Sequence, residues 1–510
     1  MNGSDRAQKS MKNISYALIG QISALLISFI LRMVFVRSLG KDYLGIDSLF
    51  VSIVSMLSLA ELGVGSAINY SLYRPISENN VERIKSLMFF YKNIYKKIGI
   101  AIFVIGISIT PIIIKSAEGN INNIGIYFIL FVINSGISYF YSYKKTLVIA
   151  DQHRHITIIY RYSFYFIMVL IQLIILLVWK NYFLYLVIML IFTFLENFFM
   201  SKKADQLYPY LKEKKISPLD KNIKKEILKN TYAMSFHKIG GVVVNSTDNI
   251  VITKFLGLSV VGMYSNYLLI TNSLNMIFGQ IFSSIIASIG NLGVEESKER
   301  VETTFNAVFF YCFFIVSFST VMLYILLNPF IRIWVGSSYI LNNTIVIFIC
   351  INFFIVQIRR GVLTFRDALG LYWFDRYKPI IESVLNIFLS VFFVQILGLS
   401  GVLIGTILSM VLTSVWIEPY ILYKHAFNKK PYHYFVKLAF YSSVTFIFAA
   451  IITVLKNKIL LLELNNSLIE FMIILLVSVF TYIILFVAIF FRNAYLKKIL
   501  KKMKVFNVGV

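Results

Sequence analysis

A polar run at residues 235–249 interrupts an otherwise apolar stretch of the chain. At about 100° per residue of an α-helix, its polar and small residues gather on one stripe: His237, Gly241, Asn245 and Asp248, with Lys238 and Asn249 beside it. The polar stripe of such a helix is suited to face water or polar cargo rather than lipid. Its cations would pair with phosphate oxygens. The alternative is that His237 and Lys238 anchor one end of the helix while Asp248 and Asn249 bond neighbouring helices.

A second set of polar residues lies nearer the N-terminus. Gln21, Ser28 and Arg32 share a helical face, and Arg32 is a candidate cavity cation or a side chain that reaches the interface. Glu61 falls within a later apolar segment. Because a charge in the centre of a span costs roughly 2.5–3.5 kcal/mol, Glu61 and Asp248 are candidates for pairing with a cation or for coupling to protons or ions.

Signals of covalent chemistry are missing from this sequence. No Gly-rich loop ends in Gly-Lys-Ser/Thr, which argues against an ATPase. No long loop carries paired carboxylates or clustered histidines. The two cysteines, Cys312 and Cys350, lie in apolar runs and can supply neither a disulfide framework nor a metal site by themselves. We therefore expect no enzyme activity, no cofactor and no metal.

Membrane-spanning helices would have to position these residues. Of 510 residues, 58% are hydrophobic and 14% charged, whereas a soluble domain carries about 25% charged residues. The sequence predicts an all-α polytopic membrane protein with about fourteen spans of suitable length. They cover residues 13–36, 45–69, 94–114, 123–143, 158–179, 183–201, 232–253, 263–288, 303–327, 339–358, 379–397, 399–422, 435–455 and 468–491.

The distribution of basic residues predicts the orientation. Of 49 Lys and Arg residues, 39 fall on one side of the predicted spans, 8 on the other, and Arg32 and Lys238 lie within spans. Since Lys and Arg accumulate in cytoplasmic loops, both termini are expected in the cytoplasm, and the net charge of +25 requires no nucleic acid. The predicted organisation is an N-lobe at 1–201, a cytoplasmic linker at 202–231, a C-lobe at 232–423, two further spans at 435–491 and a basic cytoplasmic tail at 492–510.

An internal repeat supports two related lobes. Residues 35–45 and 252–262 each contain a cation, then Leu-Gly, then a second glycine five residues after the first. Each stretch closes the first helix of a predicted lobe and opens a polar second helix. Two six-helix bundles of the same orientation, related about the membrane normal, form the architecture of a transporter.

Several stretches along the chain resemble polysaccharide repeat-unit flippases, in particular the branch that serves Gram-positive capsule and exopolysaccharide synthesis. These flippases belong to the multidrug/oligosaccharidyl-lipid/polysaccharide exporter superfamily. The stretches that carry the resemblance are 39–45, 58–68, 71–76, 149–152, 203–211, 237–249, 367–370 and 375–379.

The resemblance implies two six-helix lobes, two extra C-terminal helices and transfer of a polyprenyl-diphosphate-linked oligosaccharide from the inner to the outer leaflet of the bacterial cytoplasmic membrane. It also implies alternating access through a cationic cavity, with Arg32 and Lys238 as positional candidates for the cations. His237, Asn245 and Asn249 are the other substrate-binding candidates, and Asp248 and Glu61 the coupling candidates. The expected partners are the lipid-linked oligosaccharide, membrane lipids, a polymerase and other glycan-assembly proteins.

Other functions fit parts of the same sequence. A multidrug antiporter of this fold would carry cationic cargo, which the excess of cations in the first and seventh spans disfavours. A flippase for another lipid-linked precursor, such as lipid II or a teichoic-acid unit, stays open because no residue separates sugars. A membrane-embedded glycan polymerase is expected to have a long outer loop with basic and acidic residues, and this chain has none.

Overall fold

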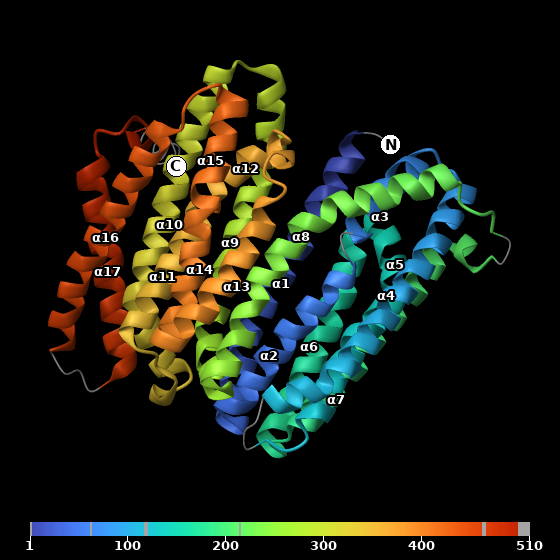
Figure 1. The fold of residues 1–510 in the computed structure, drawn as a ribbon, viewed down its shortest axis with the longest axis horizontal. Helices are drawn as coiled ribbons and strands as arrows, with labels where there is room; N and C mark the ends of the chain where they lie inside the picture. Colours follow the sequence, from blue (N-terminus) through green and yellow to red (C-terminus); the bar gives the residue numbers. More distant parts are fainter. Residues whose placement is uncertain (1–2, 62–63, 117–120, 214–215, 462–465, 498–510) are drawn as a thin grey trace, which may run out of the picture. The chain divides into compact units, whose positions relative to one another are not determined.

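The computed structural model describes residues 3–61, 64–116, 121–213, 216–461 and 466–497. These residues form helices and connecting turns, with no β-strand among them (Figure 1). Thirteen helical segments of the described chain are long and apolar enough to cross a membrane. The prediction of an all-α polytopic membrane protein is therefore confirmed.

The chain divides into two compact units at Gly262. The helices of the first unit are α1 (Gly3–Leu39), α2 (Lys41–Leu57), α3 (Val64–Ser77), α4 (Val81–Ser116), α5 (Ile124–Ala150), α6 (Arg154–Val178), α7 (Tyr182–Leu207) and α8 (Lys221–Leu256), and α9 (Leu258–Glu295) begins there. α4 packs on α5, α5 on α7, α1 on α6, and α8 on α2 and α3. α8 therefore completes the bundle of the first unit.

The second unit contains most of α9 and the remaining helices. They are α10 (Lys298–Trp334), α11 (Asn343–Ile358), α12 (Arg360–Ala368), α13 (Lys378–Leu397), α14 (Leu399–Leu412), α15 (Ser414–Leu422), α16 (Tyr432–Leu460) and α17 (Ser467–Phe490). α16 and α17, drawn in red in Figure 1, pack on α10 and on each other. Buried rings join them, and Phe313 of α10 stacks on Tyr441 of α16 with 3.9 Å between ring centroids.

Two predicted spans are interrupted in the structure. The segment predicted as one span at 45–69 is not one continuous helix: α2 ends at Leu57, a 3₁₀ turn covers Ser58–Glu61, and α3 begins at Val64. The span predicted at 399–422 breaks at Thr413, between α14 and α15. Pro419 lies inside α15, where its missing N–H removes one helical hydrogen bond.

α8 matches the predicted seventh span in position but not in apolarity. The predicted segment 232–253 lies inside this 36-residue helix. α8 is not among the thirteen apolar candidates found in the described part of the chain. The charged and amide residues of 235–249 lower the hydropathy of this segment. Much of the predicted linker at 202–231 is also helical, since α7 continues to Leu207 and α8 begins at Lys221.

The two repeated Leu-Gly stretches form matching helix junctions. Gly40 separates α1 from α2 with φ of +85°, and Gly257 separates α8 from α9 with φ of +87°. This left-handed backbone favours glycine. The second glycines meet across the junctions: a Cβ on Gly45 would lie 2.0 Å from the Leu258 carbonyl oxygen, and a Cβ on Gly262 would lie 2.0 Å from the Lys41 carbonyl oxygen. The two repeats therefore touch backbone to backbone in a reciprocal contact.

Candidate functional site

Arg32 of α1 faces a carboxylate on the next helix. The turn at Gly40 reverses the chain, so that Asp47 of α2 lies close enough for the charges of the two groups to attract each other. Tyr182 of α7 donates a hydrogen bond from its hydroxyl to Asp47 Oδ1 at 3.4 Å. Both charged side chains are half-buried. Attraction between opposite charges lowers the energetic cost of holding them among membrane-spanning helices.

Aromatic rings pack around Tyr182, the residue that bonds Asp47. Phe35 of α1 packs edge-on against Tyr182 and Tyr185 of α7, with ring centroids 5.9 and 5.3 Å apart. Tyr43 of α2 adds a third ring against Tyr182 at 5.2 Å. Sequence analysis missed Asp47, although a lone acidic residue early in the predicted span 45–69 was a usable signal. It named Glu61 instead as a partner for a cation.

Glu61 lies at a different place from Arg32. It ends the 3₁₀ turn between α2 and α3, where Tyr139 of α5 donates its hydroxyl to Glu61 Oε2 at 3.5 Å. A Cβ added to Gly65 of α3 would lie 2.8 Å from Glu61 Oε1, so the glycine gives the carboxylate room. Tyr95 of α4 is also close enough for its hydroxyl to interact with the carboxylate. Glu61 is thus half-buried among polar hydroxyl groups.

The polar stripe of α8 is described only in part. The side chains of His237, Lys238 and Asn245 lie outside the described part of the structure. Asn249 is buried and donates from Nδ2 to Ser52 Oγ of α2 at 2.9 Å. Asp248 is half-buried. Asn249 therefore connects α8 to α2, as in the alternative in which this residue bonds a neighbouring helix.

A network of buried charges joins four helices of the second unit. Glu418 of α15 is fully buried and accepts two hydrogen bonds from Arg359, at 2.9 Å from Nε and 2.6 Å from Nη2. Lys378, the first residue of α13, also pairs with Glu418. Arg366 of α12 pairs with buried Asp375 and with Asp367. A buried charge is tolerated when it is paired and hydrogen-bonded, and this network meets that condition.

One guanidinium beside this network has no carboxylate. Arg360 donates from Nε to Gln357 Oε1 at 2.5 Å and from Nη2 to the Asn275 carbonyl oxygen at 3.1 Å. Gln357 is itself held by Asn275 of α9. Neutral groups thus fix Arg360 against α9, and within the described residues its positive charge is uncompensated by an ion pair.

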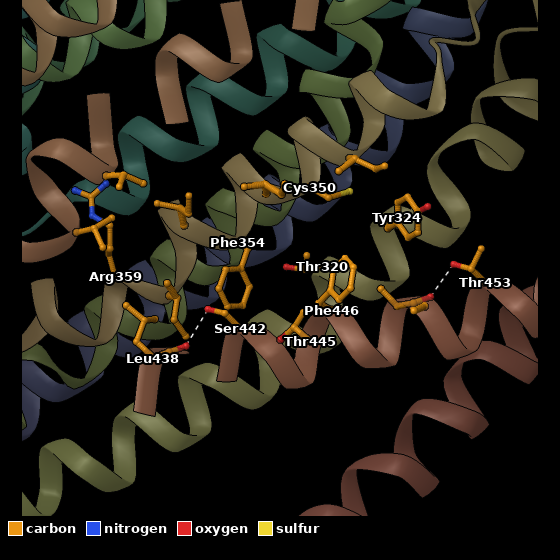
Figure 2. Close-up of a pocket in the computed structure, with 18 of the residues that line it drawn as sticks. Thr320, Tyr324, Cys350, Phe354, Arg359, Leu438, Ser442, Thr445, Phe446 and Thr453 are labelled. Carbon is orange, nitrogen blue, oxygen red and sulfur yellow. Dashed lines mark hydrogen bonds between the residues drawn. The ribbon is translucent and has the colours of Figure 1, made fainter. Parts of the chain in front are cut away.

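An apolar cavity of about 770 Å³ lies between α10, α11, α14, α15 and α16. Figure 2 shows its lining, with Arg359 towards one end and Tyr324 and Thr453 towards the other. Apolar lining residues include Ile347, Ile351, Phe354, Phe446 and Ala450. The volume falls within the range of about 300–1,000 Å³ typical of small-molecule sites.

Three of the six hydroxyl groups that line this cavity are satisfied by their own helix. Ser442, Thr445 and Thr453 of α16 each donate to the carbonyl oxygen four residues earlier, at 2.8, 2.8 and 2.6 Å. They therefore leave little demand for polar groups from an occupant. The lining fits a hydrocarbon chain better than a charged or strongly polar molecule.

Of the candidate residues predicted from the sequence, the structure brings together Arg32 with a carboxylate and Asn249 with α2, and it places Glu61 elsewhere in the same unit. It adds Asp47, Glu418 and Lys378, which sequence reasoning did not name. Glu418 lies inside the predicted apolar span 399–422, and a charge at that position was the available signal. Within the described residues, no group of three or more His, Cys, Asp or Glu side chains is arranged for a metal ion.

No family model matches the sequence, and a comparison with curated proteins finds no match. Several solved structures match in fold. The lipid II flippase MurJ, in an inward closed conformation, is 15% identical with a TM-score of 0.67, over 94% of this chain and 99% of its own.

An inward-facing multidrug resistance MATE family transporter of the MOP superfamily is 14% identical with a TM-score of 0.59, over 78% of this chain and 96% of its own. A MOP superfamily transporter from Pyrococcus furiosus is 12% identical with a TM-score of 0.53, over 81% of this chain and 94% of its own. These similarities show that the chain has the fold of MOP superfamily transporters.

Proposed function

We propose that this chain is a flippase of the MOP superfamily that moves polyprenyl-diphosphate-linked oligosaccharide repeat units across the bacterial cytoplasmic membrane. The direction is from the inner to the outer leaflet, for capsule or exopolysaccharide synthesis. The observation that carries the proposal is the apolar cavity between α10, α11 and α16. It offers hydrocarbon contact inside a membrane bundle, as a cargo with a long isoprenoid chain requires.

Charge supports the same class of cargo. A diphosphate is too polar to enter hydrocarbon unpaired, and Arg32 and Lys238 are cations within the predicted spans. Arg32 is held by Asp47 through electrostatic attraction, which fixes its position before cargo arrives. A carrier of cationic drugs has no use for such cations, so we place the multidrug antiporter second.

The extent of the structural matches also favours a lipid-linked cargo. The matched MATE transporters leave about a fifth of this chain uncovered, whereas the lipid II flippase covers 94% of it. α16 supplies many of the residues that line the apolar cavity, and it is one of the two C-terminal helices predicted outside the lobes. The same match favours lipid II, or another cell-wall precursor, as the alternative cargo.

The orientation belongs to the proposal. The excess of Lys and Arg on one side of the spans places both termini and the segment 202–231 in the cytoplasm. Alternating access between the two repeats then carries the sugar and diphosphate through, while the isoprenoid chain stays in apolar surroundings. Asp248 and Glu61 are the candidates for coupling to protons or ions.

The test compares cells that lack the protein with cells that carry it on a plasmid. We measure surface polysaccharide and the leaflet of the lipid-linked oligosaccharide, using an external glycosidase that reaches only the outer leaflet. Deletion is expected to abolish surface polysaccharide and leave the oligosaccharide protected. Normal polysaccharide and normal distribution in a strain without a second copy would refute the proposal. Accumulation of a cell-wall precursor in place of the oligosaccharide would identify that precursor as the cargo.

A pair of arginine variants tests the cationic site. Arg32→Gln removes the charge that faces Asp47, and we expect export to fall at least about tenfold, as the loss of one charge-assisted contact implies. Arg37→Gln alters an exposed arginine in the last turn of the same helix and is expected to export normally. Equal export by both variants, at equal membrane levels, would rule out a role for Arg32.

A further inference from the structure

A second cavity lies at the end of α10 and α16 away from Arg359. It has a volume of about 440 Å³. About half of its lining residues are polar, and they come from α10, α16, α17 and the start of α11: Asn328, Arg332, Asn342, Asn343, Lys456, Ser467 and Glu470. We call it the polar pocket.

The polar pocket continues the line of the apolar cavity. On α10 the lining passes from Tyr324 of the cavity to Asn328 of the pocket, and on α16 from Thr453 to Lys456. On α11 it passes from Ile347 to Asn343. Steps of three or four residues correspond to about 5–6 Å along a helix. The same three helices thus line the apolar cavity and, about one turn further on, the polar pocket.

The back wall of the polar pocket is fixed by hydrogen bonds. Asn328 donates from Nδ2 to the Leu341 carbonyl oxygen at 3.1 Å and to Asn343 Oδ1 at 2.9 Å. Tyr267 of α9 donates its hydroxyl to Asn328 Oδ1 at 2.5 Å. The Leu341 N–H donates back to the Tyr267 oxygen at 2.9 Å. The wall is therefore rigid without an occupant.

The charges of the pocket favour an anion. Lys456 and Arg332 provide two cations against the single carboxylate of Glu470. Lys456 donates to the Ile325 carbonyl oxygen at 2.9 Å, which leaves other ammonium protons for a ligand. Arg332 is exposed and, among the described residues, takes part in no ion pair or hydrogen bond. Two cations with one counter-charge in the same lining match the charge of a phosphate group.

The ends of four helices also meet at the polar pocket. Lys456 and Arg332 lie near the C-terminal ends of their helices, where a cation also interacts favourably with the helix dipole. The N-terminal turns of α11 and α17 line the same pocket through Asn343 and Glu470. N-terminal turns carry positive partial charge. These N-terminal turns oppose the two C-terminal ends, so the positive charge of the pocket comes from its side chains, two cations against one carboxylate.

We propose that the polar pocket binds the phosphate group of the polyprenyl lipid while the isoprenoid chain occupies the apolar cavity. This inference rests on the proposed function. In the proposed orientation the pocket lies on the outer side, so it holds the lipid phosphate of the cargo at the end of transfer. The amide groups of Asn342 and Asn343 then face the first sugar, where they can donate and accept hydrogen bonds.

Binding to the purified full-length protein tests this site without reference to transport. The probes are a polyprenyl monophosphate, the polyprenol with the same chain, and inorganic phosphate. We expect wild type to bind the polyprenyl phosphate about tenfold or more tightly than the polyprenol. The double variant Arg332→Gln, Lys456→Gln is expected to lose this preference and keep its affinity for the polyprenol. That retained affinity shows that the variant is folded.

Two further variants complete the test. Lys458→Gln removes an exposed lysine of the same helical end, outside the pocket, and is expected to retain the preference. Ala450→Phe fills the apolar cavity and is expected to weaken binding of both lipids. A double variant that keeps the full preference would overturn the proposal. Displacement of polyprenyl phosphate by inorganic phosphate, with no effect of Ala450→Phe, would also overturn it.

The outcomes separate this site from the proposed function. Phosphate-dependent binding lost in the double variant, combined with normal leaflet distribution in the deletion strain, refutes the transport function and supports the site. Protected oligosaccharide in the deletion strain, with unchanged binding by the double variant, supports the transport function and refutes the site.

Discussion

Removal of the Glu418 charge tests the buried network of the second unit. Glu418→Gln keeps the shape of the side chain but leaves Arg359 and Lys378 as two buried cations without their shared carboxylate. Breaking a buried pair from one side costs about 3–5 kcal/mol, because the remaining charge is desolvated and uncompensated. Asp375 lies 3.9 Å from Lys378 but already pairs with Arg366, so it replaces Glu418 only weakly.

Thermal unfolding of the purified protein in detergent measures this loss. For a unit of about 250 residues, 1 kcal/mol corresponds to roughly 2 °C in Tm, so Glu418→Gln is expected to lower Tm by about 6–10 °C. The matched control is Lys429→Gln, which removes an exposed ion pair with Glu302 and is expected to change Tm by about 2 °C or less. A fall of similar, small size in both variants would refute the reasoning that Glu418 stabilises two buried cations.

Two other predictions concern the first unit. Gly45→Ala places a Cβ against the Leu258 carbonyl oxygen and is expected to lower both Tm and export. The control is Gly241→Ala, whose Cβ meets nothing within 4 Å, and it is expected to be neutral or stabilising. Equal Tm and export in the two variants would contradict the close contact at Gly45. Tyr208→Phe removes the hydrogen bond to Asp151 Oδ2, 2.7 Å long, and is expected to lower stability by about 1–3 kcal/mol at pH 7. Burial and this hydrogen bond raise the pKa of Tyr208 above its ordinary value, so the contribution is full below about pH 10 and is lost as the pH rises through the folded-state pKa. The free energy of unfolding is measured for wild type and Tyr208→Phe between pH 7 and pH 11. The difference between the two is expected to narrow only above pH 10, and narrowing below pH 9 would contradict the prediction.

Hydropathy and charge were sufficient to predict the class of fold, because a long apolar segment indicates a membrane-spanning helix by its own composition. They did not predict the breaks at Leu57 and Thr413, since apolar residues continue on both sides of each break. The matching junctions at Gly40 and Gly257 were visible as a repeat, because left-handed backbone selects glycine.

The charge partners could not be predicted in the same way. Arg359 and Glu418 are far apart in the sequence, and their pairing depends on the rotation of α11 and α15 about their axes. Arg32 and Asp47 are closer in the sequence. Their interaction could be inferred only if the exact residue at which α1 ends and the turn at Gly40 begins were known. Sequence alone therefore identified buried charges as candidates without assigning their partners.

The polarity of α8 bears on how the chain enters the membrane during synthesis. A helix with the composition of 235–249 is a poor substrate for insertion by itself, because charged residues raise the energy of partition into lipid. Its contacts with α2 and α3, and the bond from Asn249 to Ser52, become available only after those helices are in place. We therefore expect α8 to insert stably once α2 and α3, which precede it in the chain, are in place.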